Sequence, residues 1–214
     1  MKFGKLLSFI ILLIIVIGCS QKKKEIIREG FAMSSKEAEK KADSVLALMT
    51  LDEKIEYTGG DRIFFIRAIE RLGLPEVYFT DATQGIHIRP EFTDDGTVYD
   101  LSDYAMEKST AFPSPIALAS TWNKNLALEY AKSIGEECRA GGIGVLLGPG
   151  MNIYRNSQCG RNFEYFGEDP FLASRMIENY VTGMQSTGTA ATLKHFVANN
   201  TDFFRRKSNS VVDE

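Results

Sequence analysis

The 214-residue chain has little of what a metalloprotein or a disulfide-stapled protein needs, with three cysteines and two histidines. Their positions show no spacing typical of a zinc site, so we expect no structural metal. The formal net charge is only −3, and the body of the chain has no stripe rich in Lys and Arg. Nucleic acid is therefore not an expected partner. No G-x-G-x-x-G motif follows a predicted strand, which argues against a dinucleotide site.

Long hydrophobic runs are also scarce. The longest, residues 6–17, is too short for a comfortable membrane-spanning helix, which needs about 20 apolar residues. The run follows a basic segment, residues 1–5, and precedes Cys19, a pattern typical of an export signal. Because residues 16–19 resemble a bacterial lipobox, we expect 1–19 to be a lipoprotein-type signal peptide with the lipid on Cys19. The alternative is an uncleaved membrane anchor.

Residues 20–33 include a lysine run and are predicted to be a solvated tether. A lipid on Cys19 would anchor an exported protein to the membrane in the bacterial cell envelope, and Ser20 favours the outer membrane. Two cysteines then remain, Cys138 and Cys159, which could pair in an exported protein. We expect both to be free, small, buried residues instead.

The remaining residues, 34–214, read as a globular domain, because the chain is 44% hydrophobic and 25% charged. Two capping boxes, at Ser34 and at Thr50, predict the starts of two helices. Hydrophobic periodicity predicts further helices over 62–72, 123–139 and 170–185, and short strands over 77–79, 143–147 and 190–193. Strands that alternate with helices indicate parallel βαβ units.

Some connections and helix faces can also be predicted. Segment 112–115 has two prolines and is expected to be a rigid extended loop that enters a strand. Trp122 can pack in the core or serve as a sugar platform, and we expect the core. Asp169 before Pro170 has the form of a helix N-cap. Two helices should each bury one face: Ala38, Ala42, Val45, Leu46 and Met49 on the first, and Leu126, Tyr130, Ile134 and Cys138 on the helix over 123–139.

Polar side chains follow the ends of the predicted strands. Asp81 comes after 77–79, and Lys194 and His195 come after 190–193. The carboxyl ends of parallel strands carry the active site in a (β/α)8 barrel and ligands in a doubly wound open sheet, so this placement fits both folds. Because Lys194 and His195 are consecutive, both reach one ligand only if the strand has ended or bulged there.

The charged residues suit a polyhydroxylated ligand. Hydroxyls donate and accept hydrogen bonds, charged partners bind them strongly, and aromatic rings pack on the C–H faces of a sugar. Arg161 lies among aromatic and acidic residues, one short βα unit before Lys194. Each residue also has a structural alternative. Asp81 can stabilise its own turn, Arg161 can pair with nearby carboxylates such as Glu164, and a strand-end lysine can be a solvated charge.

Three sequence blocks occur in order: Thr-Asp-Ala-Thr-Gln-Gly at 80–85, Arg-Asn-Phe-Glu-Tyr-Phe-Gly-Glu-Asp-Pro at 161–170, and Lys-His-Phe-Val-Ala-Asn-Asn at 194–200. They resemble blocks of the glycoside hydrolase family 3 β-glucosidases and β-xylosidases, and the resemblance runs over about 41–214. It implies an α/β fold, the (β/α)8 TIM-type barrel of that family's N-terminal domain. A complete barrel takes about 250 residues. We therefore expect 34–214 to form an incomplete barrel, the N-terminal portion of a longer protein.

The resemblance also implies an activity, that of an exo-acting, retaining β-glycosidase similar to the β-glucosidases. It would hydrolyse β-linked oligosaccharides or glycosides with no metal or organic cofactor. The nucleophilic Asp and the acid/base carboxylate are expected beyond Glu214, so this chain alone should be inactive. By the same resemblance, the residues expected to bind substrate are Asp81, Arg161, Lys194, His195 and Arg205.

The chain departs from the family pattern in two places. Ala82-Thr83 stands where the family commonly has Gly-Pro, and Thr201-Asp202 stands where it tends to have Gln-Glu. The sugar preference is therefore not readable. Two other functions remain open. A non-catalytic glycan-binding surface lipoprotein would keep the binding residues but lack a nucleophile, and a Schiff-base aldolase would use Lys194 as its nucleophile.

Overall fold

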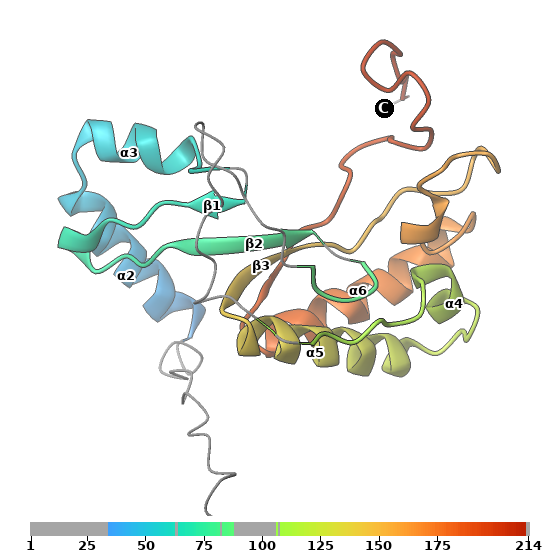
Figure 1. The fold of residues 1–214 in the computed structure, drawn as a ribbon, viewed down its shortest axis with the longest axis horizontal. Helices are drawn as coiled ribbons and strands as arrows, with labels where there is room; N and C mark the ends of the chain where they lie inside the picture. The colour runs from blue at the N-terminus through green and yellow to red at the C-terminus, as the bar shows by residue number, and fades with distance from the viewer. Residues whose placement is uncertain (1–33, 63, 82, 88–105, 107, 213–214) are drawn as a thin grey trace, which may run out of the picture.

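The computed structural model describes residues 34–62, 64–81, 83–87, 106 and 108–212. The predicted signal peptide, the lipid site Cys19 and the tether over 20–33 lie outside these residues. In Figure 1 the sheet runs across the middle of the molecule, with two N-terminal helices at one end and the larger helices at the other. Within the described ranges, no helix combines the length and the apolarity needed to cross a bilayer.

Four strands form one mixed sheet in the order β1-β2-β3-β4. Strand β1 (Phe65–Ile66) pairs antiparallel with β2 (Val77–Asp81). Strand β3 (Ile143–Leu147) pairs in parallel with β2 on one side and with β4 (Ala190–Ala191) on the other. Helices α5 and α6 connect the parallel strands and lie on the same side of the sheet (Figure 1). This is the predicted α/β architecture, part of a TIM-type barrel wall.

The N-terminal helices begin where the capping boxes predict. Helix α2 (Ser35–Leu48) is capped by Ser34, whose backbone N–H donates to the Glu37 carboxylate at 2.9 Å. Helix α3 (Leu51–Thr58) has the same device at Thr50. The expected buried face of the first helix is not found, because none of the α2 residues is buried by the part of the chain that the structure describes.

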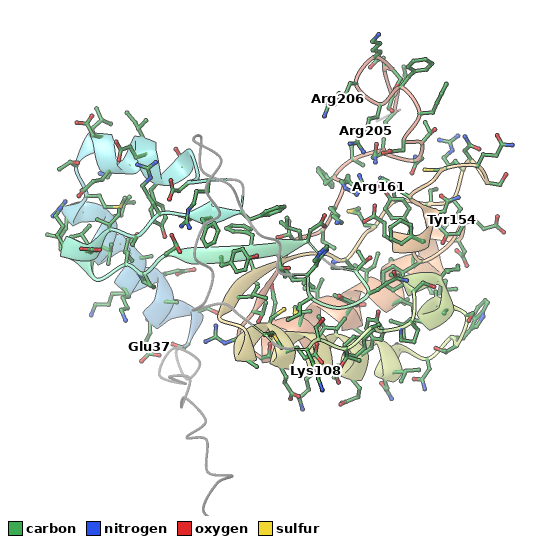
Figure 2. All side chains as sticks on the ribbon, in the orientation of Figure 1. Glu37, Lys108, Tyr154, Arg161, Arg205 and Arg206 are labelled. Atoms are coloured by element: carbon green, nitrogen blue, oxygen red, sulfur yellow. The ribbon has the colours of Figure 1, made fainter. Side chains whose placement is uncertain are left out.

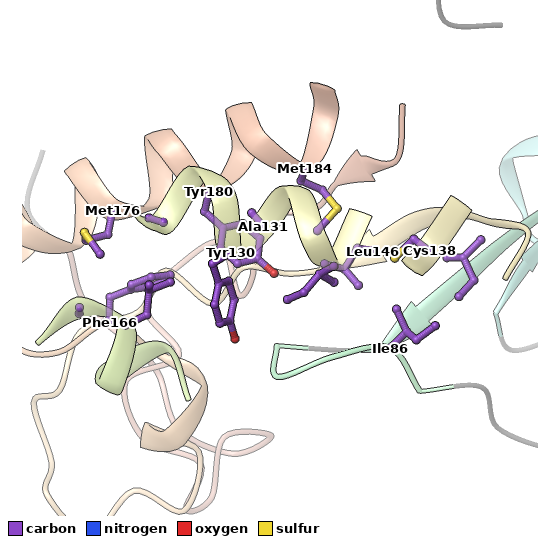
Figure 3. Packing of buried hydrophobic residues seen from close by; sticks show 14 of the residues in the cluster. Ile86, Tyr130, Ala131, Cys138, Leu146, Phe166, Met176, Tyr180 and Met184 are labelled. Atoms are coloured by element: carbon purple, nitrogen blue, oxygen red, sulfur yellow. The ribbon is translucent and has the colours of Figure 1, made fainter. Parts of the chain in front are cut away.

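The core lies between the sheet and a pair of long helices, α5 (Lys124–Ala140) and α6 (Pro170–Ser186). Figure 3 shows Tyr130 of α5 facing Tyr180 of α6, with Met184 and Leu146 beside them. The predicted face of the helix over 123–139 is correct for Tyr130, Ile134 and Cys138, which are buried. It is wrong at Leu126, which is 43% exposed in the first turn of α5. Cys138 and Cys159 are both buried and free, as expected.

Two predicted segments have a different structure. Residues 62–72 were expected to be one helix, but 65–66 form β1 and only Glu70–Leu72 is helical, as the short 3-10 helix η1. The ring of Phe65 stacks on Tyr78 of β2 at 4.6 Å between centroids, so tertiary packing on a neighbouring strand prevails over the helical pattern. Gly73 does end the helical turn, in a left-handed conformation. The strand predicted over 190–193 is also shorter in the structure, since β4 ends at Ala191.

The element that follows the loop at 112–115 was also wrongly predicted. Instead of entering a strand, 112–115 leads into the short helix α4 (Pro115–Ala119), with Pro115 at its first position, where its missing N–H has no cost. Trp122, expected in the core, is 74% exposed with a positive φ of 54°. It lies in the turn between α4 and α5, which carries its ring away from the core.

We expect Gly183 to control the packing of α5 against α6. A Cβ atom there would lie 2.1 Å from the backbone oxygen of Leu128, so the two helices touch backbone to backbone. In Gly183→Ala, overpacking should cost about 1–3 kcal/mol of unfolding free energy, exceeding the gain in helix propensity of about 1 kcal/mol. Urea unfolding measures this. The control Gly160→Ala adds a methyl group with nothing within 4 Å and should stay within about 0.5 kcal/mol. Equal stability of the two variants would contradict the prediction.

Candidate functional site

A cleft of about 760 Å³ opens at the carboxyl end of the parallel strands. One wall comes from residues 83–87 and 109–111, which lie side by side because Phe112 N–H donates to the Gln84 carbonyl at 2.8 Å. The opposite wall and the floor carry most of the predicted site residues. Those that line the cleft are Asp81, Arg161, Lys194 and Arg205. Figure 2 shows Arg161 and Arg205 near each other, with Arg205 on the C-terminal segment that leaves the sheet.

Lys194 lies at the centre of this cleft floor. Its backbone continues the parallel pairing beyond β4, since Lys194 N–H donates to the Pro149 carbonyl at 3.0 Å. Its ammonium Nζ lies 2.7 Å from Asp81 Oδ1, at the end of β2, and 3.2 Å from Glu164 Oε2. The Lys194 side chain is only 12% exposed. One cation is thus held between two carboxylates that come from different parts of the chain.

Arg161 and Glu164 belong to one tight turn, the 3-10 helix η3 (Asn162–Glu164), which Arg161 precedes directly. The guanidinium Nε of Arg161 donates to Glu164 Oε1, and the other oxygen of Glu164 contacts Lys194. Glu164 is 3% exposed. A carboxylate buried this deeply requires charged partners. The result is a chain of alternating charges, Asp81, Lys194, Glu164 and Arg161, along the cleft floor.

His195 continues this network on the far side of Arg161. Its Nε2 lies 2.8 Å from an Arg161 NH2 group and its Nδ1 lies 3.1 Å from the Tyr165 hydroxyl. A guanidinium can only donate, so Nε2 accepts, and Nδ1 carries the proton of the neutral ring and donates to Tyr165. The Asn152 amide oxygen accepts from the His195 backbone N–H at 2.8 Å and fixes the main chain. Burial and the charge of Arg161 lower the pKa of His195 from its usual value of 6.5.

Lys194 and His195 both reach the site because β4 has already ended at Ala191. Successive side chains point to opposite faces of a strand, so two consecutive residues can face one site only where the strand has ended. Arg205, the further candidate, also lines the cleft and pairs with Asp202. Asp202 lies 3.9 Å from an Arg161 NH1 group, which brings Arg205 to the edge of the same network.

The sequence was less informative about the residues that hold this network together. The pairing of Glu164 with Arg161, one of the alternatives named above, is confirmed, and its spacing of three residues was the signal for it. The second contact of Glu164, with Lys194, was not predicted. Nothing in the sequence pointed to the Tyr165 hydroxyl as a partner of His195. His87, for which the sequence predicted no function, also lines the cleft. Asp169 is a helix cap as predicted, accepting from Phe171 N–H at 2.9 Å.

No group of three or more His, Cys, Asp or Glu side chains that could hold a metal ion occurs among the described residues. The chemistry that the site offers is that of hydrogen bonding with charged donors and acceptors. The Lys194 ammonium and the Arg161 guanidinium lie with the Asp81 carboxylate on one concave floor. The His195 imidazole does not line the cleft and contacts Arg161 from behind this floor. Such an arrangement can bind adjacent hydroxyl groups in a fixed orientation.

Comparison with known proteins decides the family. The model for the glycosyl hydrolase family 3 N-terminal domain matches residues 101–207, which is half of the chain. This range includes the cleft residues Arg161, Lys194 and Arg205. The chain belongs to glycosyl hydrolase family 3. Thermostable β-glucosidase B of Acetivibrio thermocellus is 39% identical over 170 residues, and β-glucosidase BoGH3A of Bacteroides ovatus is 40% identical over 167. These alignments cover 79% and 78% of this chain and 22% of each relative.

Solved structures of this family share the fold. β-Glucosidase 3B of Thermotoga neapolitana, in complex with glucose, superposes with a TM-score of 0.64 at 40% identity, over 75% of this chain and 24% of that one. The β-glucosidase DesR of Streptomyces venezuelae, in complex with D-glucose, gives 0.68 at 35% identity, over 81% and 21%. The family 3 chain described here thus spans about a fifth of the length of the curated relatives it matches.

The lowered pKa of His195 predicts a pH dependence of stability. The unfolded chain protonates this ring near pH 6.5, whereas the folded chain does so only at lower pH. Between these values the unfolded state binds more protons, so stability falls as the pH drops below about 6.5 and is retained above it. Thermal unfolding from pH 5 to 7.5 should therefore show a smaller acid loss in His195→Gln than in the wild type. The same pH dependence in both would refute the assignment.

Proposed function

We propose that this chain supplies the sugar-binding part of an exo-acting, retaining β-glycosidase of the β-glucosidase type. The observation that carries the proposal is the alternating charge network of Asp81, Lys194, Glu164 and Arg161 on the floor of the cleft. Charged groups that are already oriented by one another bind hydroxyls without a large loss of side-chain entropy on binding. The family membership adds independent support for a glycoside as the ligand.

The individual roles follow from hydrogen-bonding capacity. Asp81, whose side chain is 36% exposed, accepts from sugar hydroxyls. Lys194 and Arg161 donate to hydroxyl oxygens, and His195 shares the same floor through its contact with Arg161. Arg205 contacts the ligand from the rim. The same geometry offers little to a Schiff-base aldolase, because such lysines lie in hydrophobic pockets or beside other cations, whereas Lys194 contacts two carboxylates.

The sugar is proposed to be a β-linked glucoside, in line with the relatives described as β-glucosidases and the neighbours determined with glucose. A 38% identical relative from Bifidobacterium longum is an exo-α-(1→6)-L-arabinopyranosidase, at nearly the same identity. Identity at this level therefore supports a pyranoside as the ligand class more strongly than it supports glucose itself.

The catalytic pair is proposed to lie outside these 214 residues. A retaining glycosidase needs two carboxyl groups about 5–5.5 Å apart, one as nucleophile and one as acid/base. The described carboxylates on the cleft floor, Asp81 and Glu164, are both bound to the Lys194 ammonium. We assign them to binding and to structure, and we place the nucleophile on a later strand of the barrel. A non-catalytic glycan-binding protein would share this floor but lack that nucleophile.

The test separates binding from hydrolysis. A protein that contains this chain and continues past Glu214 should hydrolyse an aryl β-glucoside with retention of configuration. Asp81→Asn should lower the kcat/KM of that protein at least about tenfold. The 214-residue chain should show no turnover above a heat-killed control, because it carries no catalytic pair. Turnover by this chain would refute the assignment of the carboxylates. A stop codon soon after Glu214 would favour the glycan-binding alternative.

We also propose that the protein is exported and anchored by a lipid on Cys19, on the basis of the basic segment, the apolar run and the lipobox-like residues before it. Expression in a bacterium with a labelled fatty acid should give a labelled protein in the membrane fraction. Cys19→Ala should lose the label and the membrane attachment, whereas Cys138→Ala, at a buried thiol, should keep both. Label that persists in Cys19→Ala would exclude this anchor.

A further inference from the structure

Glu164 has an unusual position in the site. Among the described residues it is the only charged residue that is buried, at 3% exposure. Its two carboxylate oxygens contact two different cations. Oε1 accepts from Arg161 Nε, and Oε2 lies 3.2 Å from Lys194 Nζ. Its depth in the floor makes it a poor direct ligand for a sugar. Its contacts instead join Arg161 and Lys194, the two residues that are proposed to donate hydrogen bonds to the sugar hydroxyls.

Both of these cations have other anions within reach. Lys194 also contacts Asp81 at 2.7 Å, and Arg161 has Asp202 at 3.9 Å from its NH1 group. Asp202 also pairs with Arg205, which lines the cleft, so it is a second anion beside Arg161. Lysine and arginine are long, flexible side chains that take up the geometry of their best partner. Without the charge of Glu164, Arg161 is drawn toward Asp202 and Lys194 is held by Asp81 alone.

The contact of Arg161 with His195 depends on the same orientation. An Arg161 NH2 group donates to His195 Nε2 at 2.8 Å while Nε is bound to Glu164. A guanidinium is rigid and planar, so fixing Nε fixes the direction of the two remaining nitrogens. The Glu164 carboxylate thereby sets where Arg161, His195 and Lys194 point relative to Asp81.

We propose that Glu164 is a positioning residue, which holds Arg161 and Lys194 in the geometry that binds adjacent sugar hydroxyls. That the ligand is a sugar rests on the proposed function. Glu164 acts through its two partners and contacts no reacting atom. Glu164 thus differs from a catalytic carboxylate, which would have to be exposed to the ligand. It also differs from a buried ion pair that only stabilises the fold.

The experiment is a double-mutant cycle on the affinity for glucose, measured by calorimetry on the 214-residue chain. Glu164→Gln, which keeps the shape and removes the charge, should weaken glucose about ten- to a hundredfold, as expected when a charge-assisted hydrogen bond is misplaced. In a Lys194→Met background the same change should have a several-fold smaller effect, because one of the groups through which Glu164 acts is gone. Equal fold-losses in the two backgrounds would overturn the proposal and leave a structural role.

A matched control exists in the same chain. Glu178 pairs with Arg175 at the same spacing of three residues, but the two side chains are 62% and 57% exposed. Glu178→Gln should leave the glucose affinity unchanged. If Glu164→Gln fails to fold, Glu164→Asp takes its place in the cycle, since it keeps the charge one methylene farther from both cations. A loss of stability with unchanged glucose affinity would again overturn the proposal.

A crystal structure of Glu164→Gln gives an outcome that does not depend on glucose. We expect Arg161 to leave His195 Nε2 and to approach Asp202. If the wild-type chain binds no glucose, the proposed function fails, while this structure still decides whether Glu164 orients Arg161. An unchanged Arg161 in the variant would contradict the positioning role even if glucose binds normally to the wild type.

Discussion

The site depends on one interaction, the Lys194 ammonium held between the carboxylates of Asp81 and Glu164. Lys194 and Asp81 are 113 residues apart in the sequence, so their contact requires the parallel strands between them to be in register. A cation that is only 12% exposed must be paired to be tolerated, and each carboxylate in turn gains from the cation. The three side chains therefore stabilise one another and fix the shape of the cleft floor.

The fold explains why these groups meet. Asp81 ends β2, Lys194 follows β4, and β3 pairs in parallel with both strands. Both residues therefore lie at the same end of the sheet, where the parallel strands have their carboxyl ends. Helices α5 and α6 cover one side of that sheet with backbones in contact at Gly183. The turn that carries Arg161 and Glu164 lines the cleft at this end of the sheet. Asp81, the turn with Arg161 and Glu164, and Lys194 follow three different strands, which is the usual way in which a barrel builds a site from strand ends.

Much of this could be predicted from the sequence because the signals were local. The capping boxes at Ser34 and Thr50, the helix cap Asp169 and the buried strand over 143–147 all depend on near neighbours along the chain. The order of the site blocks was also visible, and the structure places Asp81, Arg161, Lys194 and Arg205 along one cleft.

The errors occurred where a distant contact prevails. Phe65 lies in a strand because it stacks on Tyr78, which no local helical pattern reports. Trp122 is exposed because the turn after α4 carries a positive φ at that residue. Glu164 has its role because Lys194, 30 positions later, supplies the second cation. Tertiary structure decides such contacts, and a single sequence shows only which residues could take part in them.

We propose that a sugar binds on this charged floor. The most direct test is a crystal structure of the protein with β-D-glucose. We expect the sugar in the cleft, with neighbouring hydroxyls contacting the Asp81 carboxylate and the Lys194 ammonium, and with Arg161 and His195 in place. A sugar bound elsewhere, for example on the exposed Trp122, with this floor empty, would contradict it.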